Sequence, residues 1–129
     1  MSDPIAVWNR ALDYDVTLTA PGDIALRDAL TFDGSAQNGG LTNAIEMYET
    51  DEEFPLDRVV EGFAFLGMSL TARLISESRP QVAEGVAGAA DLEQIEETLD
   101  PLYPVAGEEL EQALASALGA TPEAFAPTS

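Results

Sequence analysis

The chain contains no cysteine, no histidine and no lysine among its 129 residues. Without cysteine it forms no disulfide, offers no thiolate nucleophile and lacks the most common ligands of a structural zinc site. Without histidine it has no imidazole base, the group most often used for proton transfer near neutral pH. Without lysine it has neither a Schiff-base amine nor the lysine of a phosphate-binding loop. We therefore expect a protein that is not an enzyme and uses no cofactor.

Positive charge is also scarce, because five arginines face 24 acidic residues and the formal net charge is −19. Residues 81–129 hold ten carboxylates and no basic residue. A surface of this kind repels nucleic acid and anionic membranes and attracts basic protein surfaces. We expect no direct binding to nucleic acid or membranes. Apolar residues make up 46% of the chain, which is typical of a folded protein and indicates that the charge covers a packed core.

Long apolar runs are missing as well. No stretch reaches the roughly 18 apolar residues of a membrane-spanning helix. Residues 1–15 have neither the basic start nor the apolar run of a secretory signal, so we expect a cytoplasmic location. The length suits one domain over residues 1–129, with a fraying tail over 120–129.

The spacing of apolar residues predicts an all-α domain of five to six helices around one long central helix. The predicted helices cover about 4–12, 23–32, 41–48, 56–78, 92–100 and 106–118. The longest, 56–78, is the predicted centre and ends at Arg79-Pro80. Gly62 and Gly67 lie inside it, where each costs about 1 kcal/mol relative to alanine, so we expect a neighbouring helix to approach closely there.

Local signals mark the ends of several predicted helices. Asp3 and Asp91 are typical N-cap residues, and Gly119 is a typical C-terminal cap. The segment Asp33-Gly34-Ser35 is predicted to end the second helix, on which Arg27 and Asp28 would face solvent. In the first helix, Ile5, Trp8 and Leu12 form one apolar face, and the sequence leaves open whether Trp8 belongs to the core or to an interface.

Four carboxylates of the helix predicted at 92–100 share one face, at spacings of three and four residues: Glu93, Glu96, Glu97 and Asp100. Like charges at these spacings are unfavourable by roughly 0.2–0.5 kcal/mol per pair. No basic residue nearby in sequence relieves them. The pattern continues with Glu108, Glu109 and Glu111, and a separate acidic loop contains Asp51, Glu52 and Glu53.

These acidic residues allow three interpretations. An unrelieved row of carboxylates resembles the anionic backbone of duplex DNA and could bind the basic surface of a DNA-binding protein. The same residues could instead serve only to solvate the protein, including in high salt. A third interpretation is an immunity or inhibitor protein against a basic toxin or nuclease. A metal site is not expected, since residues 51–53 lack the alternating acids and glycine of a calcium loop.

The tripeptide Asn38-Gly39-Gly40 is predicted to form a sharp turn between two helices, because glycine tolerates left-handed backbone conformations. The functional alternative is a backbone-lined notch with Gln37 and Asn43 as hydrogen-bonding groups. The sequences AQNGGLTNAIEMY and FAFLGMSLTARLISES, within residues 20–80, resemble a family of small acidic bacterial proteins that carry an Asn-Gly-Gly motif. This chain has Leu41, Thr42 and Asn43 where that family usually has an aromatic residue and a glutamine.

The family is mostly of unknown function and includes a DNA-mimic protein. The resemblance implies a mainly helical fold. Together with the charge, it leads to the expectation of a non-enzymatic acidic module that occupies the basic DNA-binding surface of a partner. The alternatives of a salt-adapted or stress-related structural protein and of an immunity protein stay open.

Overall fold

Seven α-helices and two short 3-10 helices form the computed structural model, which describes residues 2–128. The α-helices are α1 (Pro4–Leu12), α2 (Pro21–Gly39), α3 (Leu41–Glu49), α4 (Leu56–Phe65), α5 (Ser69–Val86), α6 (Leu92–Leu99) and α7 (Glu109–Ala120). The 3-10 helices are η1 (Asp100–Leu102) and η2 (Pro122–Ala124). No strand occurs within residues 2–128. The all-α prediction is therefore confirmed, although the described chain has more helices than the five to six predicted.

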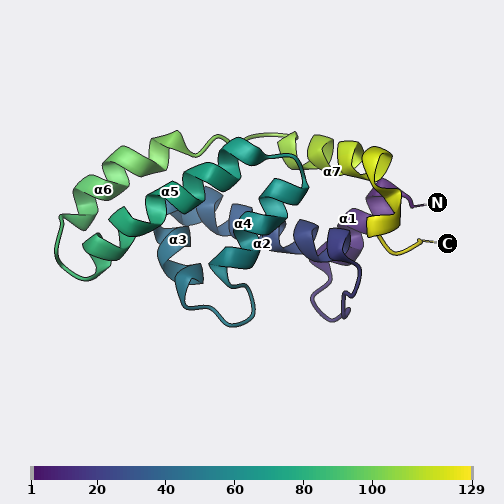
Figure 1. The fold of residues 1–129 in the computed structure, drawn as a ribbon, viewed down its shortest axis with the longest axis horizontal. Helices are drawn as coiled ribbons and strands as arrows, with labels where there is room; N and C mark the ends of the chain where they lie inside the picture. Colours follow the sequence, from purple (N-terminus) through teal and green to yellow (C-terminus); the bar gives the residue numbers. More distant parts are fainter. Residues whose placement is uncertain (1, 129) are drawn as a thin grey trace.

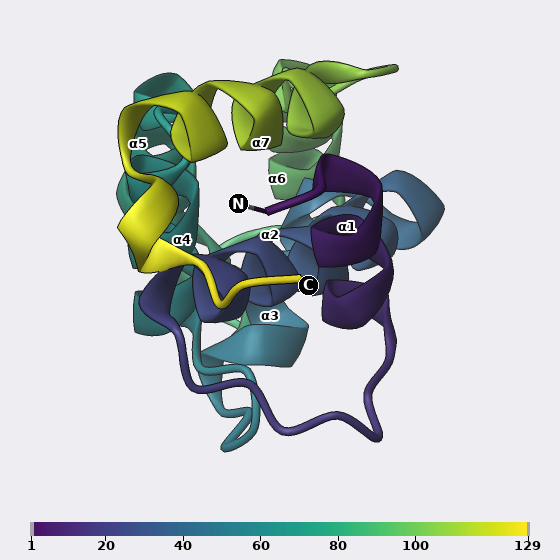
Figure 2. The ribbon, with the colours of Figure 1, turned by 90° about the vertical axis from the view of Figure 1, so that its right-hand side faces the viewer.

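Helices α2 and α4 pack extensively against each other in the middle of the molecule. Helices α5 and α6 extend toward one end, while α1, α7 and both termini lie at the other (Figures 1 and 2). Phe32 on α2 meets Phe63 on α4 edge to face, with 6.0 Å between ring centroids. A Cβ on Gly62 would lie 2.8 Å from the Ala25 carbonyl oxygen, so the predicted close approach is confirmed at this glycine.

The predicted central helix over 56–78 is wrong, because it is two helices. Helix α4 ends at Phe65, and α5 begins only at Ser69. Between them Gly67 has φ +79°, its N–H bonds the Ala64 carbonyl, and the Met68 N–H bonds the Phe63 carbonyl. This is a Schellman cap, in which a left-handed glycine satisfies the last carbonyls of a helix. The sequence predicts Gly67 inside a helix, close to a neighbouring helix, but in the structure Gly67 caps the end of α4.

Helix α5 also continues through Pro80, which was predicted to end it, and reaches Val86. A proline inside a helix removes one hydrogen bond and costs about 3 kcal/mol. Contacts beyond the proline offset this cost, since Val82 and Gly85 are both buried. A Cβ on Gly85 would lie 2.8 Å from a Leu92 methyl group, so α6 packs closely on α5 at this point. Tertiary packing has therefore overridden a local stop signal.

Helix α2 likewise passes its predicted end at Asp33-Gly34-Ser35 and includes Asn38 and Gly39. Two tertiary hydrogen bonds hold this extension. The Ser35 hydroxyl lies 2.7 Å from the Tyr48 hydroxyl, and the Gln37 amide donates to the Val105 carbonyl at 2.6 Å. The predicted Asn-Gly-Gly turn is therefore reduced to one residue, Gly40, which has φ +92°.

The apolar face at Ile5, Trp8 and Leu12 is not the face that α1 buries most fully. Val7 and Ala11 are fully buried, whereas Ile5 is 71% and Leu12 is 45% exposed. Trp8 lies between these extremes and packs partly against the core. The small side chain of Ala11 lets α1 pack closely against the core, and the larger apolar residues are left on the outer side.

The predicted N-caps are confirmed for two helices. Asp3 accepts a hydrogen bond from the Ile5 N–H, and Asp91 accepts one from the Glu93 N–H, each at 3.1 Å. The last long helix differs from its prediction at both ends: it begins at Glu109 instead of 106, and Gly119 lies inside it.

The tail over 120–128, for which the sequence predicts fraying, packs against α2. Phe125 is buried, and a Cβ on Gly22 of α2 would lie 2.8 Å from the Phe125 ring. The Ala126 N–H donates to Asp23 at 3.1 Å.

Candidate functional site

Four of the five arginines are used inside the fold, and Arg73 is exposed. Asp23 is 1% exposed and accepts a hydrogen bond of 2.8 Å from Arg10, which also donates to the carbonyls of Ala126 and Pro127. Arg79 bridges Glu49 and Asp57 and so joins α3, α4 and α5. These hydrogen bonds raise the pKa of Arg79 above its ordinary range.

Arg27 binds the C-terminal end of α1 and the loop that follows it. Its guanidinium donates hydrogen bonds to four backbone carbonyls and lies 5.2 Å from the centre of the Tyr14 ring, a cation–π contact. The prediction that Arg27 and Asp28 face solvent is wrong, because Asp28 is 1% exposed and Arg27 is partly covered. The backbone carbonyls of an irregular loop and a buried carboxylate both need donors, and arginine supplies them in this fold.

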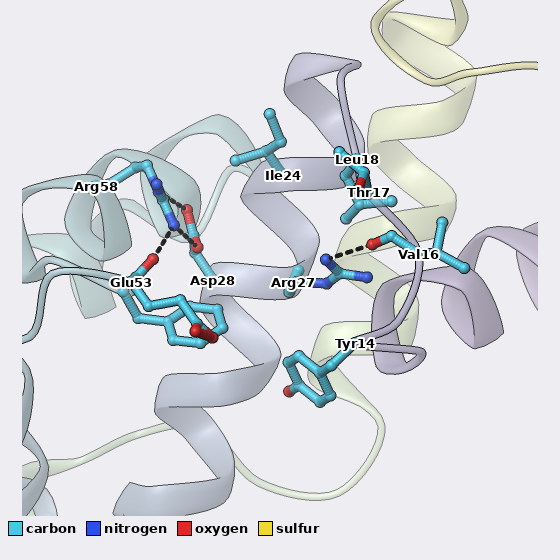
Figure 3. Close-up of a pocket in the computed structure, with 10 residues that line it drawn as sticks. Tyr14, Val16, Thr17, Leu18, Ile24, Arg27, Asp28, Glu53 and Arg58 are labelled. Carbon is cyan, nitrogen blue, oxygen red and sulfur yellow. Dashed lines mark hydrogen bonds and ion pairs between the residues drawn. The ribbon is translucent and has the colours of Figure 1, made fainter.

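Asp28 and Arg58 form the central ion pair of the molecule. The two Asp28 oxygens accept from Arg58 Nε at 2.7 Å and from Nη2 at 3.0 Å. Arg58 also donates to the Glu53 carbonyl at 2.6 Å (Figure 3). Burial raises the pKa of Asp28 above its ordinary value, and the hydrogen bonds from Arg58 partly offset this effect. The Asp28 hydrogen bond in turn raises the pKa of Arg58.

This pair lies in an open pocket of about 350 Å³ that Tyr14, Arg27 and Phe54 also line. Figure 3 shows Arg58 directed at Asp28 and Arg27 directed at the Val16 carbonyl. Each oxygen of the buried carboxylate accepts a hydrogen bond from the guanidinium. The arrangement fixes loops on both sides of α2.

Aspartate and glutamate take different places in this structure. Within residues 2–128, every aspartate side chain except that of Asp15 accepts a hydrogen bond or forms an ion pair, whereas Glu49 is the only glutamate whose side chain does so. Short aspartate side chains bind nearby backbone N–H groups and so favour caps and turns. The longer glutamates extend into solvent. Four of the five arginines are engaged elsewhere, and within residues 2–128 no ion pair involves an exposed glutamate other than Glu49.

The predicted row of carboxylates on α6 is only partly exposed. Glu93 and Glu97 are exposed and Glu96 is half-buried. Asp100 does not belong to this surface, because its carboxylate accepts a hydrogen bond of 2.8 Å from the Thr42 N–H at the start of α3. No basic residue nearby in sequence relieves this carboxylate, but the fold does, because the Thr42 N–H and the positive dipole end of α3 stabilise it.

The acids of α7 lie on the same edge of the molecule as α6, but toward its opposite end (Figure 1). Glu108, Glu109 and Glu111 are all exposed, and they precede or open the helix. In both ribbon views α6 and α7 occupy the same edge, the upper one (Figures 1 and 2). Negative charge in the first turn of a helix is favourable, so α7 tolerates these residues without a partner.

The acidic loop over 51–53 lies at the opposite, lower edge in both views. The Asp51 side chain is hydrogen-bonded within its own turn, since it accepts from the N–H groups of Glu53 and Phe54 at 2.9 and 2.7 Å. Glu52 and Glu53 are exposed. This loop therefore cannot form one continuous surface with α6 and α7.

The Asn-Gly-Gly segment has a structural place. Asn38 and Gly39 complete α2, and Gly40 joins α2 to α3. A Cβ on Gly40 would clash with the Asp100 carboxylate. Gln37, one of the two polar groups of the alternative notch, is bound to the Val105 carbonyl.

The ion pairs of Asp23 and Asp28 were missed by sequence reasoning. Each pair joins a carboxylate of α2 to an arginine of another helix, and Asp28 and Arg58 are separated by 30 positions. No local pattern indicates such a pair, because the spacing depends on how the helices pack.

Within residues 2–128, no three acidic side chains come together in a way that could hold a metal ion. In the same part of the chain, no helix combines the length and apolar character needed to cross a membrane. Comparisons with protein-family models, with curated proteins and with solved structures found no match to this chain.

Proposed function

We propose that this protein is a non-enzymatic binding module whose α6–α7 edge binds a basic surface of another protein. We define this edge by its exposed glutamates, Glu93, Glu97, Glu108, Glu109 and Glu111. The observation that supports the proposal is the absence of counter-charge: four of the five arginines are engaged inside the fold, and none of the hydrogen bonds or ion pairs in the described chain involves the side chains of these glutamates. A cationic partner would relieve their mutual repulsion.

The partner that best suits this edge is a DNA-binding protein, with the glutamates in the place of phosphates. Duplex DNA is a regular row of anions, and proteins bind it largely through lysine and arginine contacts to the backbone. The mimic would occupy the basic face and compete with DNA. An immunity protein against a basic toxin or nuclease would use the same edge.

The test compares two variants of equal net charge. One changes the five edge glutamates to glutamine. The control changes five exposed glutamates elsewhere, namely Glu46, Glu52, Glu61, Glu77 and Glu84. Each protein is immobilised and exposed to a cell lysate at low and at high salt, and bound proteins are then challenged with duplex DNA.

We expect the parent and the control to retain nucleic-acid-binding proteins that salt and duplex DNA release, and the edge variant to lose them. Equal retention by both variants would contradict a binding role for this edge. Retained proteins that do not bind nucleic acid, or that DNA does not displace, would exclude DNA mimicry.

A second candidate function is solvation in high salt. The observation that favours it is the spread of unpaired glutamates onto other elements, including Glu46 on α3, Glu61 on α4 and Glu84 on α5. A salt-adapted protein should unfold at low salt and gain stability as salt is added, because cations screen its self-repulsion. Melting temperature measured from low to molar potassium chloride separates the two functions, since a binding module should remain folded at low salt.

A further inference from the structure

A groove of about 220 Å³ lies between α1 and α7, at the end of the molecule that Figure 2 faces. Pro4, Ile5 and Trp8 line it from α1, and Glu111 and Leu114 line it from α7. Four of these side chains are apolar or largely so, and the fifth is an exposed carboxylate without a partner. The groove therefore combines an apolar floor with one negative charge at its rim.

The apolar character continues along the outer side of α1. Ile5 is 71% exposed, Leu12 is 45% exposed, and Trp8 lies between them at helical spacing. Exposed apolar residues that gather on one helix face, next to a groove, are typical of protein interaction sites. From α1 the core takes up Val7 and Ala11 fully and Trp8 only in part, so Ile5 and Leu12 are left outside it.

The charge around the groove is negative. Glu108 lies one turn before Glu111 and is exposed. Arg10 is the arginine of α1, but it is bound to Asp23 and to two carbonyls of the C-terminal tail. It is therefore not available to neutralise Glu111. An occupant of this groove must supply both an apolar side chain and a cation.

We propose that the groove binds a basic amphipathic helix of the partner protein. An apolar side chain of that helix would insert beside Ile5 and Trp8, while a lysine or arginine one turn away would contact Glu111. This is the helix-in-groove mode of recognition. The proposal rests on the proposed function, since it describes how part of the basic partner is held.

Charge argues against two other possible occupants of the groove, a second copy of this chain and a membrane surface. A second copy of this chain would bring another net charge of −19 to the same place. An anionic membrane surface would repel the groove for the same reason.

The test uses the single tryptophan of the chain, Trp8, as its probe. The full-length protein is titrated at physiological salt with a synthetic peptide of leucines and lysines arranged on opposite helix faces. The control peptide has the same composition in scrambled order. We expect a saturable blue shift of Trp8 emission with the amphipathic peptide, and affinity for the scrambled peptide lower by roughly tenfold, because the scrambled helix has no apolar face to bury.

Matched variants locate the binding. Ile5→Ser should weaken binding of the amphipathic peptide by about tenfold, while Leu102→Ser, which removes another apolar side chain that is 54% exposed, should change it by less than about twofold. Glu111→Gln should weaken binding by about two- to fivefold and reduce its dependence on salt.

The outcomes separate this inference from the proposed function. Equal binding of both peptides, unaffected by Ile5→Ser, would overturn the groove as the docking site and leave a basic partner in place. Failure of both peptides to bind even at low salt would contradict the basic partner as well. A dimer seen by analytical ultracentrifugation that Ile5→Glu dissociates would show that a second copy fills the groove, and would overturn the proposal.

Discussion

The carboxylate of Asp100, at the end of α6, accepts a hydrogen bond of 2.8 Å from the backbone N–H of Thr42, in the first turn of α3. The residues are 58 positions apart, so this is an N-cap supplied by a distant part of the chain. Gly40 makes room for it, because a Cβ there would clash with the carboxylate. The acid therefore belongs to the stability of the fold.

We expect Asp100→Ala to lower the free energy of unfolding by about 1 kcal/mol, the usual cost of losing an N-cap. Asp100→Asn should cost less, since an amide oxygen can accept the same hydrogen bond. Urea denaturation followed by helical circular dichroism measures both. The control is Glu97→Gln on the exposed face of α6, which should change stability by less than about 0.5 kcal/mol. If Asp100→Ala is as mild as this control, the capping interpretation is wrong.

Two glycines inside helices should respond in opposite directions to the same substitution. Gly62→Ala should destabilise the protein by about 1–3 kcal/mol, because the added Cβ would lie 2.8 Å from the Ala25 carbonyl oxygen and push α4 away from α2. Gly34→Ala should stabilise it by about 0.5–1 kcal/mol, since the added Cβ would meet no atom within 4 Å beyond its own stretch of helix backbone and alanine favours the helix. Thermal melting of the two variants checks the sign of each effect. A stabilised Gly62→Ala variant would contradict the close packing of α2 on α4.

The Arg58 side chain should contribute more to the free energy of unfolding at neutral than at acidic pH. Its removal in Arg58→Met leaves the buried Asp28 carboxylate unpaired. This should lower the free energy of unfolding by about 2–3 kcal/mol at pH 7. The loss should be smaller than for a fully buried pair, because the Arg58 side chain is 43% exposed.

The sign of the pH dependence follows from Asp28. Burial already raises its pKa above the ordinary value, and loss of Arg58 removes the hydrogen bonds that offset burial. The folded variant therefore binds a proton more readily than the unfolded chain does. Its loss in free energy of unfolding, relative to the parent, should shrink as pH falls toward the ordinary pKa of an aspartate. Urea denaturation of variant and parent at several pH values measures this difference. Arg73→Met is the control, because Arg73 is exposed and takes part in none of the hydrogen bonds or ion pairs of the described chain. A deficit that stays constant with pH would contradict an uncompensated Asp28 charge.

Much of the helical architecture could be predicted from local sequence signals. The N-caps at Asp3 and Asp91 and the bounds of α3 and α6 match their predictions to within about one residue, a usual uncertainty of helix ends. These features depend on residues within a turn or two of each other. The helix over 56–78 could not be resolved in the same way, because α4 and α5 place apolar residues in the same core and their spacing conceals the break at Gly67.

The candidate site was predictable in composition but not in arrangement. Apart from the half-buried Glu96, the glutamates of α6 and α7 are exposed, since charged residues on a helix surface remain solvated. Asp51 and Asp100 were also expected at a partner surface, yet each binds backbone N–H groups of its own fold. The sequence could not decide which face of α1 is buried, because both sides of this helix carry apolar residues at suitable spacing.

By itself the sequence determined the helical class and the excess of negative charge, because helix propensity, capping and formal charge are properties of short segments and of composition. Only the tertiary structure decided which acids are paired and which apolar face of α1 is left open. Those outcomes depend on distances between residues far apart in the chain, such as Asp28 and Arg58, and these distances are set only when the helices pack together.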